Sequence, residues 1–373
     1  MKNILLATTG TSPQVLTETL YAIHQSGRPF PDEIYVITTQ SSAPVLVNGL
    51  FRGGNFQALI DEYDMPVIQF DESHIWLIED DNGNRIDDAK SVDDQTHMAN
   101  FITRKVYELT LDDNVAIHAS LAGGRKTMAF YFGYAMSLFG REQDILSHVF
   151  VDDEYEFVRD FWYPTKESKW VTGKNGLGEV DVSKANITLA EIPFVRMRSS
   201  VDQSLISSMA NYSFSQTVGM LNASHNDELK VLLQKRSRSI STVGVDIKLT
   251  AKEFAFYLWL LSKGKSGVVV DRDFDNDCIY SKEFLTTYSE FAKDPRVFSS
   301  FNTTPEDFKE GDYSLLIGME REFLQPICST INRKLKYALP SLAADKIEIK
   351  SMSEGYDQRY SILQQRAGVV ISV

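Results

Sequence analysis

Residues 3–23 read Asn-Ile-Leu-Leu-Ala-Thr-Thr-Gly-Thr-Ser-Pro-Gln-Val-Leu-Thr-Glu-Thr-Leu-Tyr-Ala-Ile. The apolar run at residues 4–7 predicts a short buried strand that breaks at Gly10. Apolar residues at helical spacing follow, with Ser12 at the expected N-cap and Pro13 at the first helical position. A strand, a polar loop and a helix N-terminus in this order favour an anion site, commonly for phosphate. An ordinary capped helix is the alternative, because neither a dinucleotide fingerprint nor a Walker loop is present.

A second loop of this kind follows the strand predicted at residues 115–118. It reads Ser120-Leu-Ala-Gly-Gly-Arg-Lys-Thr-Met and leads into an apolar helix at residues 128–139. Its two glycines let the backbone approach a ligand closely. Arg125 and Lys126 fall in the first helical turn, where the helix dipole disfavours cations. A bound anion would explain them, and two solvated surface residues are the alternative.

The composition limits the class of protein. The 373 residues predict two domains or one large one, and 43% hydrophobic with 24% charged residues fit a globular protein. A formal net charge of -13 argues against a nonspecific nucleic-acid coat. Cys278 and Cys328 form neither a disulfide framework nor a zinc site. The chain enters a strand without a signal peptide and has no membrane-spanning segment, so a cytoplasmic protein is expected.

Strands and helices alternate through the first half of the chain. Besides those above, strands are predicted at residues 33–39, 67–70, 74–78 and 145–151, and helices at 45–63 and 93–111. This alternation predicts an α/β fold with a doubly wound, mostly parallel, Rossmann-like sheet. Both polar loops then lie at the carboxyl ends of strands, where such sheets bind ligands. The acidic loop at residues 79–88 is interpreted as a solvated excursion.

The elements predicted after residue 151 no longer alternate regularly between strand and helix. An aromatic strand is predicted at residues 157–164, a glycine-rich hairpin at 173–178, a closing strand at 187–195, a hinge at Ser199-Ser200 and a helical region at 201–233. A strand at 240–249, a capping box at Thr250-Ala-Lys-Glu253, helices beginning near residues 304 and 320, and a hairpin around Gly355 follow. This predicts a smaller α+β, winged helix-turn-helix-like domain, or an interaction domain without a DNA role. The predicted domains are 1–198 and 199–373.

Residues 1 to about 165 resemble the CRISPR-associated Rossmann-fold (CARF) domains of type III CRISPR systems. The resemblance lies in Ala7-Thr-Thr-Gly-Thr-Ser-Pro-Gln-Val-Leu-Thr-Glu-Thr and in the Gly-Gly-Arg-Lys loop. It implies a homodimer that binds cyclic oligoadenylate, a second messenger. Some of these proteins, the ring nucleases, also cleave it. The C-terminal third is similar, more loosely, to winged-helix domains attached to several CARF proteins.

The resemblance implies a site and a reaction. By motif, Ser12 and Lys126 match the family's catalytic residues. The predicted ligand-binding residues are Thr9, Gly10, Thr11, Pro13, Gln14, Ser120, Gly123, Gly124, Arg125 and Thr127. No metal or other cofactor is expected, because the ribose 2′-OH attacks the neighbouring phosphate and leaves a 2′,3′-cyclic phosphate. Positioning and electrostatics would supply the rate.

The motifs and the resemblance are compatible with more than one function. The favoured one is a ring nuclease that acts on cyclic tetra-adenylate. Cyclic hexa-adenylate remains possible as the substrate, because the sequence does not give the ring size. The alternative is a transcription regulator that senses cyclic oligoadenylate without cleaving it, although the charge does not favour DNA as a partner. An effector ribonuclease is disfavoured because no histidine follows His225. A nucleotide-cofactor enzyme lacks its glycine fingerprint. No membrane partner is expected.

Overall fold

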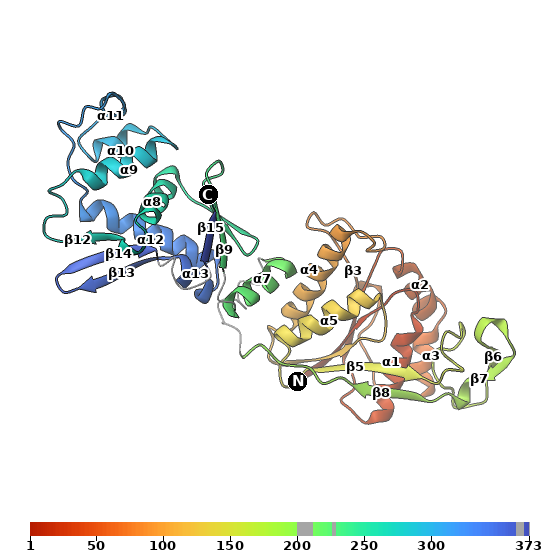
Figure 1. Ribbon diagram of the computed structural model, residues 1–373. Coiled ribbons are helices and arrows are strands. Elements are labelled where there is room, and N and C mark those ends of the chain that lie inside the picture. The colour runs from red at the N-terminus through yellow and green to blue at the C-terminus, as the bar shows by residue number, and fades with distance from the viewer. Residues whose placement is uncertain (200–211, 226–228, 363–368, 373) are drawn as a thin grey trace. The chain divides into compact units, whose positions relative to one another are not determined.

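The structure, a computed structural model, describes residues 1–199, 212–225, 229–362 and 369–372 (Figure 1). The described residues form two compact units of mixed α and β structure. The first holds residues up to 199 together with 212–214, and the second begins at Ser215. Among the described helices, none has both the length and the apolar composition to cross a lipid bilayer.

A largely parallel sheet lies at the centre of the first unit. Its strand order is β3-β2-β1-β4-β5-β8, and only the last pair, β5 with β8, is antiparallel. The strands are β1 (Lys2–Thr8), β2 (Glu33–Thr38), β3 (Ile75–Leu77), β4 (Val115–Ser120), β5 (Ile145–Val151) and β8 (Ile187–Glu191). The mostly parallel sheet predicted from the alternation is confirmed. The order reverses between β1 and β4, and their carboxyl ends frame a crevice.

Helices cover both faces of this sheet. The helical segments are α1 (Gln14–Ser26), α2 (Ala43–Val47), the π-helix η1 (Asn48–Arg52), α3 (Asn55–Glu62), η2 (Glu72–His74), α4 (Val92–Leu109), α5 (Lys126–Phe139), η3 (Lys174–Gly176) and η4 (Val182–Lys184). Helix α1 packs with α3, and α4 packs with α5 on the other face (Figure 1). Residues 4–8 of β1 are all buried, as a strand covered on both faces requires.

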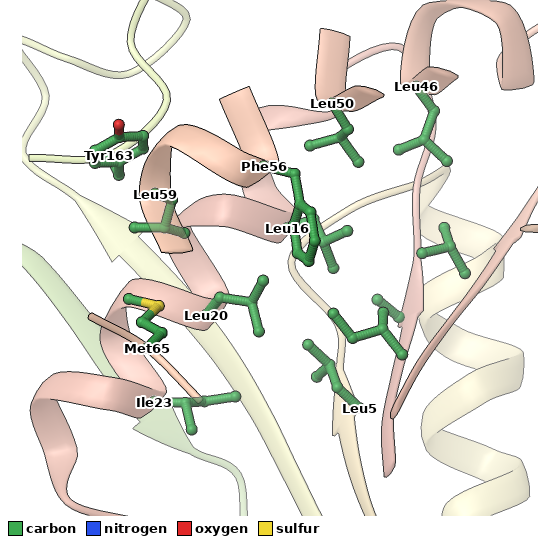
Figure 2. Packing of buried hydrophobic residues seen from close by; sticks show 13 residues of the cluster. Leu5, Leu16, Leu20, Ile23, Leu46, Leu50, Phe56, Leu59, Met65 and Tyr163 are labelled. Carbon is green, nitrogen blue, oxygen red and sulfur yellow. The ribbon is translucent and has the colours of Figure 1, made fainter. Parts of the chain in front are cut away.

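One core lies between β1 and α1. Leu5 of β1 meets Leu16, Leu20 and Ile23, which recur on one face of α1, and α3 adds Leu59 (Figure 2). The spacing of the α1 residues is the helical period seen in the sequence. This packing fixes the N-terminal end of α1 over the carboxyl end of β1.

Two strand predictions in this unit are wrong. Residues 67–70 form only an isolated bridge, Glu33↔Gln69, because β3 takes the place beside the rest of β2. Residues 157–164 form turns rather than an aromatic strand, with Phe157 at a φ of 64°. Tyr155, Val158 and Phe161 instead bury themselves in a small cluster at a spacing of three. A strand would need a spacing of two. The glycine-rich hairpin is confirmed by β6 (Trp170–Thr172) and β7 (Glu179–Asp181).

The second unit contains two sheets among its described residues, in the orders β11-β10-β9-β15 and β12-β14-β13. Its strands are β9 (Leu229–Gln234), β10 (Ser239–Thr242), β11 (Val245–Lys248), β12 (Val268–Val270), β13 (Ile349–Glu354), β14 (Asp357–Ile362) and β15 (Val369–Ser372). Strand β15 pairs in parallel with β9. The helical segments are α7 (Phe214–His225), α8 (Ala251–Ser262), η6 (Gly264–Ser266), α9 (Ile279–Ser289), α10 (Pro295–Ser299), α11 (Pro305–Glu310), α12 (Arg321–Ala338) and α13 (Ser341–Ile347).

Several predictions for this unit are confirmed and others are wrong. The Thr250–Glu253 capping box, the helices near 304 and 320 and the hairpin around Gly355 are present. The helix predicted at 201–233 is wrong from Leu229 onward, where β9 begins, and residues 201–211 lie outside the described ranges. The single strand at 240–249 is wrong because Val243 and Gly244, at φ values of 47° and 77°, turn it into the hairpin β10–β11. Ser200, half of the predicted hinge, is also outside the described ranges.

Candidate ligand-binding site at the ends of β1 and β4

The two glycine loops lie against each other because β1 and β4 are neighbouring parallel strands. Thr8 Oγ1 donates a hydrogen bond to the Gly123 carbonyl oxygen at 2.9 Å. A Cβ placed on Gly10 would lie 3.5 Å from the Gly124 Cα. A Cβ on Gly123 would lie 2.5 Å from the Thr8 carbonyl oxygen, so only glycine fits there without a shift. The predicted neighbourhood of the two loops is thus present in the fold.

The loops open onto a cavity of about 630 Å³, a size that suits a nucleotide-scale ligand. Its wall combines both loops, the first turns of α1, strand β5 and the segment after β5. The residues that line it are Gly10, Thr11, Ser12, Gln14, Val15, Glu18, Ala122, Gly123, Gly124, His148, Val149, Phe150, Val151, Asp153, Tyr155, Glu156, Phe157, Val158 and Arg159. Residues from five parts of the first unit therefore converge on one cavity.

The first loop differs from its prediction in one detail. Pro13, not Ser12, is the N-cap of α1, and the first turn closes from the Leu16 N–H to the Pro13 carbonyl oxygen at 3.1 Å. Ser12 is exposed at the cavity, and its hydroxyl makes no hydrogen bond within the described residues. The hydroxyl is therefore open to a ligand rather than spent on capping the helix. Gln14 Nε2 donates to the Arg159 carbonyl oxygen at 2.9 Å and ties α1 to the segment after β5.

The remaining predicted residues do not line the cavity. Thr9, Pro13 and Ser120 are buried beneath the loops. Thr9 accepts a hydrogen bond from Thr38 Oγ1 on its carbonyl oxygen at 2.8 Å. Arg125, Lys126 and Thr127 are exposed at the N-terminus of α5. Lys126 forms no ion pair within the described part of the chain.

Arg125 forms an ion pair with Asp88 of the acidic loop at residues 79–88. The sequence predicts this loop to be a solvated excursion. Arg125 Nε donates to Asp88 Oδ1 at 3.1 Å, and Nη2 contacts the same oxygen. Lys90 Nζ lies 2.6 Å from Asp88 Oδ2. The hydrogen bonds from Arg125 and Lys90 hold the pKa of Asp88 below its usual range. The pair joins residues far apart in the chain, so no local pattern in the sequence could reveal it.

Glu18 is the main cavity residue that the sequence interpretation missed. It is 9% exposed, and no hydrogen bond or ion pair from another described residue reaches its carboxyl group. Burial raises the pKa of this carboxyl to about 7. A usable pattern was present, because Glu18 follows Gln14 by four residues and so shares its helix face. The sequence does not predict His148, Phe150, Phe157 and Arg159 as cavity residues, because β5 and the turns after it reach the cavity only in the folded chain.

Comparison with known protein families finds a match over residues 12–226, to the family described as CRISPR-associated protein NE0113. The match covers more than half of the chain, including Ser12, Glu18 and the whole second loop. The chain belongs to the NE0113 family. No curated protein matches it. Membership in the NE0113 family makes this a CRISPR-associated protein, as the sequence motifs suggested. Within the described ranges of this NE0113 family member, no group of three His, Cys, Asp or Glu side chains could hold a metal ion.

Proposed function

We propose that the first unit is a Rossmann-like CARF domain that binds cyclic tetra-adenylate and cleaves it, so that the protein acts as a ring nuclease in type III CRISPR signalling. The observation that carries the proposal is the meeting of the two glycine loops over one cavity that Ser12 lines, with Lys126 exposed two residues beyond Gly124 at the start of α5. Within the described residues, the Ser12 hydroxyl has no hydrogen bond and Lys126 has no ion pair. Backbone N–H groups at the N-terminus of α1 suit a phosphate. The CRISPR-associated family supports a messenger of that system.

The proposed reaction uses the substrate's own hydroxyl group. The ribose 2′ oxygen attacks the adjacent phosphorus, the bond from phosphorus to the 5′ oxygen breaks, and a 2′,3′-cyclic phosphate forms. The proton of the 2′-OH leaves to solvent, and the 5′ oxygen takes one up. Lys126 stabilises the extra negative charge on the phosphoryl oxygens, and the Ser12 hydroxyl positions the ribose or a phosphate oxygen.

A ring with its own symmetry fits on the two-fold axis of a homodimer. We therefore place Ser12 and Lys126 of both protomers around one ring in this proposal. Sedimentation of the full chain tests it, since a monomer with and without cyclic tetra-adenylate would contradict the shared site.

The direct test is incubation with labelled cyclic tetra-adenylate and cyclic hexa-adenylate in EDTA, with products separated by chromatography. Linear products ending in a 2′,3′-cyclic phosphate are expected from the tetra-adenylate. Activity that is lost in EDTA and restored by Mg²⁺ or Mn²⁺ would require a different mechanism. Binding without any product would leave a sensor rather than a nuclease.

The regulator alternative is weaker because ion pairs occupy two basic residues near the end of α12, Lys334 and Lys336. Lys334 Nζ lies 2.6 Å from Glu253 Oε2, and Lys336 Nζ lies 2.8 Å from Glu348 Oε2. Asn332 exchanges two hydrogen bonds with the backbone of Ile349, each at 2.8 Å. Among the polar residues at this end of α12, these three serve the fold of the second unit. A winged-helix role in DNA binding is therefore not favoured.

A further inference from the structure

Glu18 occupies a position on α1 that faces the cavity rather than the core. Residues 16, 20 and 23 point into the core with β1 and α3, while Gln14, Val15 and Glu18 line the cavity. On the turn that carries Glu18, Thr19 Oγ1 lies 3.3 Å from Ser120 Oγ, beneath the second loop. Thr11 and Ser12 of the first loop are exposed, so Glu18 is the more buried part of the cavity wall.

The carboxyl group of Glu18 has no partner among the described residues, and its oxygens are not fully buried, so they face the cavity. It is 9% exposed and lines the cavity, yet no described residue donates to it or forms an ion pair with it. Burying a polar group without a hydrogen bond is costly, and most such groups have a partner. A ligand in the cavity is the partner that this geometry leaves open.

The depth of Glu18 indicates which part of a nucleotide reaches it. A phosphate at the N-terminus of α1 would lie near Gln14, and four residues of helix advance about 6 Å from there. In a nucleotide bound with its phosphate near Gln14, a group about 6 Å further along α1 lies toward the base. Two aromatic side chains, Phe150 and Phe157, line the same cavity and are 55% and 76% exposed. Lys174 Nζ lies over one face of the Phe157 ring, 5.0 Å from its centre, and the aromatic faces left open suit the stacking of a base.

We propose that Glu18, in its neutral form, binds an adenine base of the ligand. Its O–H donates to a ring nitrogen, and its carbonyl oxygen accepts from the N6 amino group. Adenine presents an acceptor nitrogen beside this donor, whereas an ionised carboxylate has only acceptors. The inference rests on the proposed function, because it assigns a specificity role within the same cavity. The raised pKa of Glu18 is consistent with it, since the neutral form then persists to about pH 7.

Other groups near α1 could also titrate or carry charge. Those lining the cavity are His148, Asp153, Tyr155, Glu156 and Arg159. On β8 and α3, which also pack against α1, they are Glu191, Asp61 and Glu62. Glu191 is paired with Arg28, and Asp61 accepts from Gln57 Nε2 at 2.7 Å. His148 is the one whose residue type commonly titrates near neutral pH, so it needs a control.

The test measures the affinity for cyclic tetra-adenylate by calorimetry on the full chain, from about pH 6 to about pH 8.5. With the wild type, we expect the affinity to fall about 30-fold over this range, as a single ionisation near pH 7 requires. Glu18→Gln should keep the wild-type affinity at the acid end within about threefold and remove the pH dependence, because its amide both donates and accepts. Glu18→Ala should bind about tenfold more weakly at the acid end and also be flat. His148→Asn should keep the wild-type slope.

The outcomes separate this inference from the proposed function. A flat wild-type profile, together with an unchanged affinity of Glu18→Ala, overturns base recognition while leaving ring binding in place. Normal binding by Glu18→Gln with loss of cleavage also overturns it, because Glu18 would then be a proton donor to the reaction. No binding by the wild type at any pH overturns the proposed function itself. If Glu18→Ala does not fold, the comparison of wild type with Glu18→Gln still decides.

Discussion

The carboxyl group of Glu18, which has no partner among the described residues, makes the stability of the fold depend on pH. Its pKa is about 7 in the folded protein against 4.5 in the unfolded chain, so between these values only the folded state keeps the proton. Stability is therefore lost as the pH rises from about 4.5 to about 7. Glu18→Gln should raise the free energy of unfolding by up to about 3 kcal/mol at about pH 8 and have little effect below about pH 4.5. Urea denaturation at both pH values measures this, and an equal effect at both would contradict it.

Substitution of Lys126 and substitution of Ser12 should have different effects on the cleavage rate and on the affinity for the ring. Lys126→Ala should lower the cleavage rate about 100-fold and also weaken binding, because one cation serves both the bound state and the transition state. Ser12→Ala should lower the rate with a smaller loss of affinity. Single-turnover cleavage and calorimetry separate the two effects. Lys184 is exposed and does not line the cavity, so Lys184→Ala is a matched control. Cleavage at the wild-type rate by the double variant would refute the site.

The ion pair between Arg125 and Asp88 competes with any anion that Arg125 binds. Asp88→Asn should raise the affinity for cyclic tetra-adenylate about threefold to tenfold, because Arg125 no longer exchanges a carboxylate for a phosphate. Asp87→Asn removes the same charge one residue earlier, where no carboxylate ion pair is present among the described residues. If both variants bind equally well, the gain comes from net charge alone and the competition is absent.

At the scale of elements, the contact between the two loops depends on glycine. A Cβ at Gly123 would lie 2.5 Å from the Thr8 carbonyl oxygen and 3.2 Å from the Thr9 Cα. Gly123→Ala should therefore lower the free energy of unfolding by about 1–3 kcal/mol and weaken ring binding. Gly133→Ala, within α5 where the nearest atom is 4.0 Å away, is the matched control and should be neutral or stabilising. Thermal melting and calorimetry distinguish them, and equal stability of both variants would contradict the predicted clash.

The elements also show what the sequence could predict. The parallel sheet and the meeting of the loops follow from local patterns, because alternating strands and helices place loop ends at one edge of the sheet. Residues 157–164 form turns where a strand was predicted, because aromatic residues suit both a strand and a buried turn. The buried residues Tyr155, Val158 and Phe161 recur at a spacing of three, which a strand does not have. Asp88 and Glu18 depend on contacts and burial that only the folded chain creates. The cavity wall beyond the loops was therefore not predictable.

For the protein as a whole, the negative net charge disfavours DNA binding. The net charge is -13, and Lys334 and Lys336 are paired with carboxylates. We expect weak or no sequence-specific DNA binding at physiological salt, because few unpaired cations remain on α12 to contact phosphates. Fluorescence anisotropy with DNA from the neighbourhood of the gene, with and without cyclic tetra-adenylate, measures this. Tight binding that the ring alters would make the protein primarily a regulator.

Strand β15 is made long after its neighbour in the sheet. It pairs with Leu229–Leu232 of β9, although well over a hundred residues separate the two strands along the chain. During synthesis, β9, β10 and β11 can form their antiparallel meander early, but the free side of β9 stays unpaired until β15 leaves the ribosome. An open strand edge of this kind invites pairing with another nascent chain. The second unit should therefore have a late, aggregation-sensitive step in its folding, and a lower concentration of nascent chains should favour recovery of the native protein.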